Sequence, residues 1–287
     1  MIDKPELLCI GMQKAGTRWL YQVLSQFQNT LMLPIKEFHH FDSINNGTLD
    51  SETNLKRLKR AVRNNKSILS QGEFLEFSKA FEAYIKEPMN ETYQAMFEVA
   101  GDRLTADFTP AYSTLNEKEI AKVKALLPDA KVILIIRDPI TRAWSHFNMY
   151  LRNKLKQQYL NRDALQKVIE EYATLEELNE FVGSQAFKTR AFPSKIYRRW
   201  KKVYTNMLVL DFHEIQITPQ EVIKKTAEYL LGREAHANYD LNLTNRKESE
   251  PKAKIQLSHL HFLKQLFVNE RLYFSSEMPS FAESWIN

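Results

Sequence analysis

Apolar residues in this chain form short continuous runs that alternate with stretches of helical spacing. The runs predict buried strands at Leu7–Met12, Leu104–Phe108, Lys131–Arg137 and Met207–Asp211. The clearest is "KVILIIR", because β-branched and other apolar residues fill it without interruption. Strands that alternate with helices indicate a parallel sheet, so we expect an α/β fold with a central parallel β-sheet flanked by helices.

Helices are predicted from apolar positions that recur every three or four residues. They cover Thr17–Gln26, 53–66, Glu117–Leu127, the segment "ITRAWSHFNMYLR", 162–172, 174–182, 194–204, 219–231 and a final helix at about 254–268. We expect a single domain over 1–287, with helical insertions at about 43–100 and 150–190 and a C-terminal helical segment at about 240–287.

Three loops follow predicted strands: Gly11–Thr17, Thr109–Tyr112 and Arg137–Ser145. Ligands of parallel sheets bind beyond the carboxyl ends of the strands. We therefore expect these three loops to converge on one site.

Composition narrows the class of protein. The chain has 287 residues, of which 44% are hydrophobic and 26% charged, as in ordinary globular proteins, and its net charge of +5 suits anionic partners. A single cysteine, Cys9, excludes an intrachain disulfide, fits a reducing compartment and is expected to be buried. No apolar run approaches the roughly 20 residues that a membrane span needs, and the N-terminus lacks a signal-peptide pattern. The expectation is a cytoplasmic protein without a membrane span.

The stretch "CIGMQKAGTRWLYQVL" has the features of a phosphate-binding loop that opens a helix. Gly11 and Gly16 stand five residues apart, and a helix beginning at Thr17 offers backbone N–H groups and the positive end of its dipole. Lys14 adds a cation. Thr17 stands where the nucleotide-binding loop GxxxxGK[ST] has its lysine, so the usual hydroxyl ligand of magnesium is missing. Such a loop suits a transferred group with less charge than a γ-phosphate, for example a sulfuryl group.

A second anion site is predicted after the strand at Lys131–Arg137. Arg137 ends that strand, and Ser145 lies about two turns into the following helix. An arginine can hold a phosphate with two parallel hydrogen bonds, and a serine hydroxyl can add a third. A nucleotide with phosphates at two separate places would use both this site and the first loop.

Taken together, "KAGTRWL" and "RDPITRAWSHF" resemble the motifs of the PAPS-dependent sulfotransferases, which transfer a sulfuryl group from 3′-phosphoadenosine 5′-phosphosulfate (PAPS). Four further stretches are similar, in the family's order, to its carbohydrate-type, Golgi-like branch and its bacterial relatives: "KEFHHFD", "DFTPAYS", "YRRWKKVYTNMLVLDFHEI" and, weakly, "NRKESEPK". The resemblance implies a P-loop-like three-layer fold and in-line attack of an acceptor hydroxyl or amine on sulfur. It also implies adenosine 3′,5′-bisphosphate (PAP) as the product, no metal, and an acceptor on a glycan or glycolipid.

The resemblance also assigns roles to single residues. Lys14 would stabilise the bridging oxygen of the leaving phosphate, and Glu37 would remove the acceptor's proton, with Lys36 beside the transferred group. His39 and His40 are alternative bases. Arg137 and Ser145 would hold the 3′-phosphate and so exclude ATP. The 5′-phosphate would lie on the loop residues Lys14, Ala15, Gly16, Thr17 and Arg18, and Trp19 would contact the adenine.

The chain departs from the family pattern at two places. Arg18 replaces the usual small hydroxyl or amide residue of the loop, and it either adds a contact or points away. Phe108 stands where heparan-type enzymes have a lysine, which argues against a heparan acceptor used in their manner. The role of Asp107 stays open between a second acidic group at the acceptor and an organiser of the turn.

The alternatives to a sulfotransferase are a P-loop kinase and a nucleic-acid-binding module. A P-loop kinase would need a lysine directly after Gly16, where Thr17 stands, and a nucleic-acid-binding module would rest only on the basic segments at 56–66 and 195–202. Those basic segments are expected to be solvated faces or, alternatively, parts of a groove for an anionic acceptor. No metal site is expected, because the seven histidines include no HxxxH pair with a supporting carboxylate.

Overall fold

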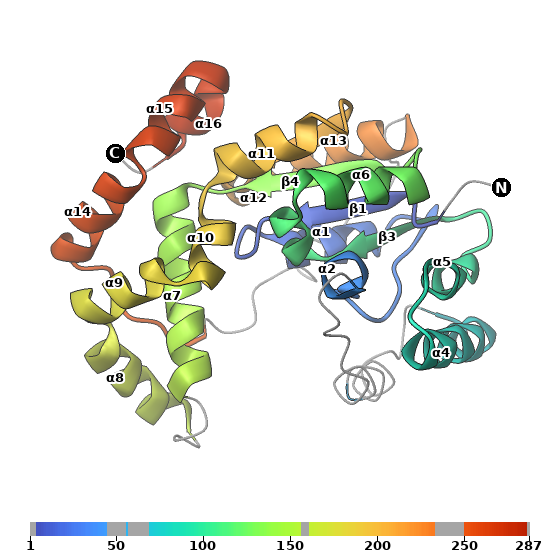
Figure 1. Cartoon of the computed structure of the whole chain (residues 1–287), viewed down its shortest axis with the longest axis horizontal. Coiled ribbons are helices and arrows are strands. Elements are labelled where there is room, and N and C mark those ends of the chain that lie inside the picture. Colours follow the sequence, from blue (N-terminus) through green and yellow to red (C-terminus); the bar gives the residue numbers. More distant parts are fainter. Residues whose placement is uncertain (1–3, 45–55, 57–68, 156–160, 233–249, 286–287) are drawn as a thin grey trace.

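The computed structural model describes residues 4–44, 56, 69–155, 161–232 and 250–285. Its centre is a five-stranded parallel sheet in the order β2-β3-β1-β4-β5 (Figure 1). The strands are β1 (Leu7–Gly11), β2 (Thr30–Leu31), β3 (Leu104–Phe108), β4 (Lys131–Ile136) and β5 (Met207–Asp211). The predicted α/β class and its parallel sheet are confirmed. Strand β2 was not predicted, because a strand of two residues is too short to show a period.

Helices surround the sheet. They are α1 (Thr17–Leu24), α2 (His40–Ile44), α4 (Gln71–Lys86), α5 (Asn90–Glu98), the short 3₁₀ helix η1 (Pro110–Thr114), α6 (Glu117–Leu126), α7 (Pro139–Leu155), α8 (Arg162–Tyr172), α9 (Leu175–Gly183), α10 (Gln185–Ala191), α11 (Pro193–Lys201), α12 (Phe212–Ile217), α13 (Pro219–Leu231), α14 (Leu257–Leu266), α15 (Val268–Glu277) and α16 (Pro279–Glu283). Figure 1 shows α6, α11 and α13 along one side of the sheet, with α7 to α10 gathered at one end of the molecule and α4 and α5 at the other.

Two expectations about helices need correction. The helix predicted at about 254–268 is present as α14, but the prediction that it is the final helix is wrong, because α15 and α16 follow it. The interruption comes at Phe267, whose backbone leaves the helical region and whose ring is buried. The predicted basic helix at 53–66 and most of "NRKESEPK" fall outside the described residues, apart from Lys56 and the stretch from Glu250.

The core explains why β4 is the strongest strand in the sequence. Its residues from Val132 to Ile136 are completely buried, because β1 and β5 pair with it on either side and helices cover the sheet. A second apolar cluster joins α7 to α8, α9, α10 and α14 and includes Phe147, Leu178, Phe187 and Leu263. Because this cluster anchors α7, the residues on the remaining face of α7 are held in fixed positions near the sheet edge.

All five strands run in the same direction, so the segments after β1, β3, β4 and β5 emerge at one edge of the sheet. Cys9 on β1 is level with Phe108 on β3 and Ile133 on β4, and its buried thiol agrees with the prediction. Across the described part of the chain, none of the helices has the length and apolarity that crossing a membrane requires.

Candidate functional site

The loop between β1 and α1 is packed tightly at both of its glycines. Gly11 has φ +129°, and a Cβ atom there would lie 3.0 Å from the carbonyl oxygen of Pro110. Gly16 has φ +94°, and a Cβ atom there would lie 3.0 Å from the ring of Phe212. Both positions therefore require glycine for backbone conformation and for space. The loop is held between η1 on one side and α12 on the other.

The N-terminus of α1 is available to an anion. Its N-cap residue is Gly16, and no side chain of the described residues caps it. Helices α4 and α6, in contrast, are capped by Ser70 and Asn116. The first N–H groups of α1 therefore receive no side-chain cap, and an uncapped helix N-terminus is suited to binding an anion. Thr17, the first residue of α1, is buried apart from 7% of its surface.

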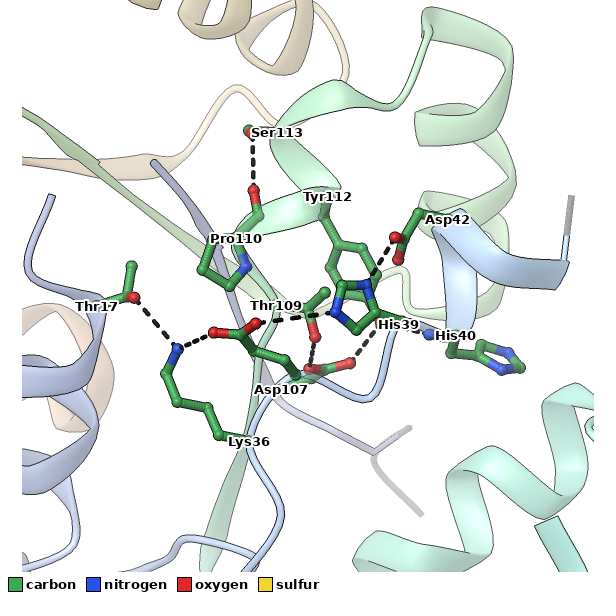
Figure 2. A network of polar contacts seen from close by, with 11 residues as sticks. Thr17, Lys36, His39, His40, Asp42, Asp107, Thr109, Pro110, Tyr112 and Ser113 are labelled. Atoms are coloured by element: carbon green, nitrogen blue, oxygen red, sulfur yellow. Dashed lines mark hydrogen bonds and ion pairs between the residues drawn. The ribbon is translucent and has the colours of Figure 1, made fainter. Parts of the chain in front are cut away.

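A continuous series of polar contacts runs from this loop to α2 (Figure 2). The Lys36 ammonium donates to the Thr17 hydroxyl at 3.3 Å and to the Glu37 carboxylate at 2.8 Å. The other oxygen of Glu37 lies 3.8 Å from His39 Nε2, and His39 Nδ1 lies 2.8 Å from the Asp42 carboxylate. The structure thus brings Thr17, Lys36, Glu37 and His39 together at the start of α1.

The backbone around Glu37 is fixed by β3 and η1. The Glu37 N–H donates to the carbonyl oxygen of Phe108, and the His40 N–H donates to the Tyr112 hydroxyl, both at 3.1 Å. Glu37 and His39 have φ values of +67° and +59°, which non-glycine residues adopt rarely and at a cost of about 1–3 kcal/mol each. The surrounding contacts hold this strained conformation, in which the Glu37 carboxylate meets Lys36 and the His39 ring meets Asp42.

The Glu37 carboxyl group is ionised throughout the physiological pH range. Burial opposes its charge, but the nearby His39 ring and the ammonium of Lys36 outweigh burial and lower the pKa of Glu37 to about 2. The side chain is also 41% exposed, so a bound molecule can reach it. The group is therefore an accessible carboxylate with a cation beside it.

Asp107 organises the turn after β3. Its side chain is fully buried and accepts hydrogen bonds from Thr109 at 2.6 Å, Tyr112 at 2.6 Å and Tyr93 at 2.9 Å. Burial raises its pKa, although the three hydroxyl donors oppose that shift. Because no part of the carboxyl group is exposed, the geometry favours the turn-organising alternative over direct contact with an acceptor.

His40 is part of the core. Its ring is completely buried and stacks on Tyr93 with 4.0 Å between the ring centres, while its two nitrogens contact Tyr84 and Asn90 at 3.1 Å. Burial lowers the pKa of His40 to about 4. The imidazole is therefore neutral at pH 7 and enclosed, whereas the neighbouring His39 remains half-buried at the site.

Acidification is expected to destabilise the protein through His40. The pKa is about 6.5 in the unfolded chain and about 4 in the folded one, so between these values the unfolded state binds more protons and stability falls as the pH falls. The contribution approaches about 3 kcal/mol by pH ~4, at 1.36 kcal/mol per pKa unit. Urea denaturation of the wild type and of His40→Gln at several pH values checks this, and an identical pH slope in the two proteins would contradict it.

Arg137 follows β4 and forms a hydrogen bond with the loop between β1 and α1. Its Nη1 donates to the carbonyl oxygen of Lys14 and its Nε to the Thr141 hydroxyl, both at 3.1 Å. The guanidinium also lies 4.5 Å from the centre of the Phe212 ring. A cavity of about 150 Å³ opens beside it, between the loops after β4 and β5 and the C-terminal segment at Trp285. The arginine therefore borders both the loop and an open space.

Helix α7, which carries Ser145, begins at Pro139, and the preceding residue, Asp138, caps its N-terminus. Both carboxylate oxygens of Asp138 accept from backbone N–H groups, those of Ile140 at 3.1 Å and Thr141 at 3.3 Å. An anion near this helix would therefore depend on side chains. Ser145 is half-buried on α7.

The other predicted loop residues have different environments. Lys14 is half-buried with φ +68°, and Ala15 is fully buried, with its N–H donating to the carbonyl oxygen of Met12 at 3.2 Å. Arg18 is exposed, and Trp19 is half-buried against the main core. Arg18 and Trp19 thus lie on α1 beside the loop without joining the series of contacts from Thr17 to Asp42.

Three residues near the site were not predicted as site residues from the sequence: Phe212, Arg142 and His146. Phe212 packs on Gly16 and Arg137, and Arg142 and His146 are buried on α7 one turn apart. The spacing of four between Arg142 and His146 was visible in "TRAWSH" and indicates a shared helix face. The burial of that face, however, depends on α9 and α10, which lie far along the chain.

Comparison with solved structures finds the same fold in two bacterial proteins. A sulfotransferase from Alicyclobacillus acidocaldarius superposes with a TM-score of 0.62 and 17% identity, over 98% of this chain and 99% of that one. The sulfotransferase domain of the Synechococcus PCC 7002 olefin synthase superposes with a TM-score of 0.53 and 14% identity, over 93% and 95%. At such low identity these matches establish the fold alone.

A search among curated proteins finds no significant match. A model of the sulfotransferase family matches residues 5–230, which is most of the chain. The matched range includes the loop between β1 and α1, the segment around Glu37 and all five strands of the sheet. This protein belongs to the sulfotransferase family.

Proposed function

We propose that the protein transfers a sulfuryl group from PAPS to a hydroxyl or amine of an acceptor, on a glycan or glycolipid. The observation that carries this proposal is the series of contacts from the phosphate loop at Thr17, through Lys36, to the accessible carboxylate of Glu37. It places a base and a cation within hydrogen-bond reach of each other at the end of α1. Family membership supports sulfate transfer as the reaction.

The donor would be held at its two ends. The 5′-phosphosulfate would accept hydrogen bonds from the uncapped N-terminus of α1 and from Lys14, while the 3′-phosphate would pair with Arg137 and Ser145. Arg137 bonds directly to the carbonyl oxygen of Lys14, so the two ends are mechanically connected. The open space beside Arg137 supports a ligand at this place.

The chemical step is an in-line displacement. Glu37 takes the proton of the acceptor group, whose oxygen or nitrogen attacks sulfur as the bond between sulfur and the bridging oxygen of the 5′-phosphate breaks. Negative charge develops on that bridging oxygen, where Lys14 stabilises it, and Lys36 faces the sulfuryl oxygens. The products are the sulfated acceptor and PAP, with the proton on Glu37. His39, held by Asp42, fixes the orientation of the carboxylate.

No metal enters this scheme, and we propose a cytoplasmic location from the composition. The kinase alternative gains no support, because Thr17 occupies the position of the required lysine and the family match is to sulfotransferases. A nucleic-acid-binding role likewise has no motif behind it.

Nucleotide binding tests this proposal. Calorimetry in the absence of magnesium is expected to show tight binding of PAP and binding at least tenfold weaker for ADP and ATP. The substitution Arg137→Gln is expected to lower the affinity for PAP by about 10–100-fold, because it removes charge-assisted hydrogen bonds worth roughly 1.5–3 kcal/mol. The affinity for adenosine 5′-phosphosulfate, which lacks the 3′-phosphate, is expected to change less than threefold.

Arg198→Gln is the matched control, because Arg198 is an exposed arginine on α11 and its loss changes the net charge equally. Equal losses of both nucleotides in Arg137→Gln would remove Arg137 from the 3′-phosphate site. Magnesium-dependent binding of ATP with no response to PAP would instead support the kinase alternative.

A further inference from the structure

A buried arginine on α7 has no hydrogen-bond partner among the described residues. The Arg142 side chain on α7 is 0% exposed, and none of its three guanidinium nitrogens has a hydrogen-bond partner among the residues that the structure describes. Burial, together with the charges of Arg137 and Arg190, lowers its pKa to about 9, so it remains a cation at neutral pH. A buried cation without a partner is costly, and native proteins pair such groups with an anion.

Two more nitrogen-bearing side chains lie at the same place. His146 is one turn further along α7, 7% exposed, and its Nδ1 is buried without a partner in the described chain. Its ring lies 5.0 Å from that of Phe181 on α9 and 6.2 Å from that of Phe187 on α10. Arg190 is three residues beyond Phe187 on the same helix, and its charge acts on both Arg142 and His146.

This cluster, consisting of Arg142, His146 and Arg190, is linked through Arg190 to the residues around the proposed base, Glu37. The charge of Arg190 interacts with Asp42, the residue that holds His39 beside Glu37. Helix α10, which carries Arg190, contacts η1 directly, and η1 in turn contacts α2. Arg137, in contrast, faces Phe212 and the cavity near Trp285. Through α10, η1 and α2 the cluster is connected to the segment that carries His39 and Asp42.

The cluster differs from an apolar core because it contains two arginines, one of them fully buried. Burial and the charges of Arg142, Arg190 and Lys14 lower the pKa of His146 to about 3, so this ring is a neutral donor beside the two arginines. Asp42 is the acidic group that acts on Arg190, and one oxygen of Asp42 already bonds His39. An anionic group of a bound molecule would supply the missing counter-charge to Arg142, and three donors are available to it.

We propose that Arg142, with His146 and Arg190, binds an anionic group of the acceptor, so that the substrate is a molecule already carrying a carboxylate, phosphate or sulfate near the group to be sulfated. This inference rests on the proposed function, because it places the acceptor beside Glu37. It narrows the acceptor from any alcohol or amine to an acidic one, and it assigns α7 and α10 the selection of that acceptor.

The test is anion binding by the protein saturated with PAP, in which the donor's phosphates already occupy their own sites. Calorimetric titrations with inorganic phosphate, sulfate and acetate are expected to show one bound anion. Arg142→Met is expected to weaken it at least tenfold, with PAP affinity changed less than threefold. Arg190→Gln, at a half-buried position on α10, is the second variant and is expected to weaken anion binding in the same way, so the test does not depend on the folding of Arg142→Met. Lys188→Gln, an exposed position on α10, is the matched control and is expected to bind normally.

Each other result contradicts the inference in a recognisable way. A loss of PAP affinity in Arg142→Met equal to the loss of anion affinity would assign Arg142 to the donor site. No anion binding to the PAP complex would overturn the cluster as a site, whereas failure of the wild type to bind PAP would overturn the proposed function itself. Phenyl phosphate is expected to bind as tightly as phosphate, and its exclusion would show a closed ion pocket with no room for an acceptor.

Discussion

Replacement of Lys14 by alanine is expected to lower the turnover of sulfate transfer by about 10³-fold with little change in melting temperature. The reason is electrostatic: removal of one positioned donor from a developing negative charge typically costs about 10²–10³ in rate, and the full charge of lysine places it at the upper end. Lys14 is half-buried in the loop with its backbone in the left-handed region, and alanine keeps the Cβ atom, so the backbone strain is unchanged and the fold is expected to be retained.

Single-turnover kinetics with labelled donor, together with thermal unfolding, measure this effect. Lys118→Ala on α6 is the matched control, because Lys118 is an exposed lysine on another helix. Turnover of Lys14→Ala within tenfold of the wild type would refute the role of Lys14 at the leaving oxygen. A large drop in melting temperature would mean that the loop's structure, and not its charge, had been lost.

Glu37→Gln is expected to lower turnover by about 10²–10⁴-fold, the usual contribution of a positioned general base, while PAP affinity stays within threefold of the wild type. The amide has nearly the shape of the carboxylate and can still meet Lys36 and His39, but it cannot take a proton. Glu91→Gln, an exposed position on α5, is the control.

The pH dependence adds a sharper check on Glu37. With a pKa of about 2 in the free protein, this carboxylate remains ionised at pH ~4, so kcat/KM is not expected to show the loss of a base with an ordinary glutamate pKa. If Glu37→Gln kept its activity, His39 would become the candidate, because His40 and Asp107 are completely buried and His39 is not.

The strand pattern and the first loop could be predicted because they depend on local chemistry. Buried parallel strands leave uninterrupted apolar runs such as that of β4, and the glycines at 11 and 16 stand where the backbone takes positive φ. Helix α4 lies within the helical insertion predicted at about 43–100, and the signals for its bounds are present in the sequence: Ser70 and Glu73 form a capping box, and Phe77, Phe81 and Tyr84 lie on one face.

The rest depends on contacts between distant segments. Asp107 is saturated by hydroxyls from η1 and from α5, and the residue's own neighbours in the sequence cannot reveal the contribution of Tyr93. The burial of Arg142 likewise comes from the packing of α7 in a cluster with α9, α10 and α14. In the sequence Arg142 is only a helical arginine, and such residues are usually exposed.

The most direct test of the account is a crystal structure of the protein with PAP. The account predicts the 5′-phosphate at the N-terminus of α1 within hydrogen-bond distance of Lys14 and Thr17, and the 3′-phosphate on Arg137 and Ser145, with no metal ion between them. PAP bound away from the loop that follows β1, or with its 3′-phosphate touching neither Arg137 nor Ser145, would contradict it.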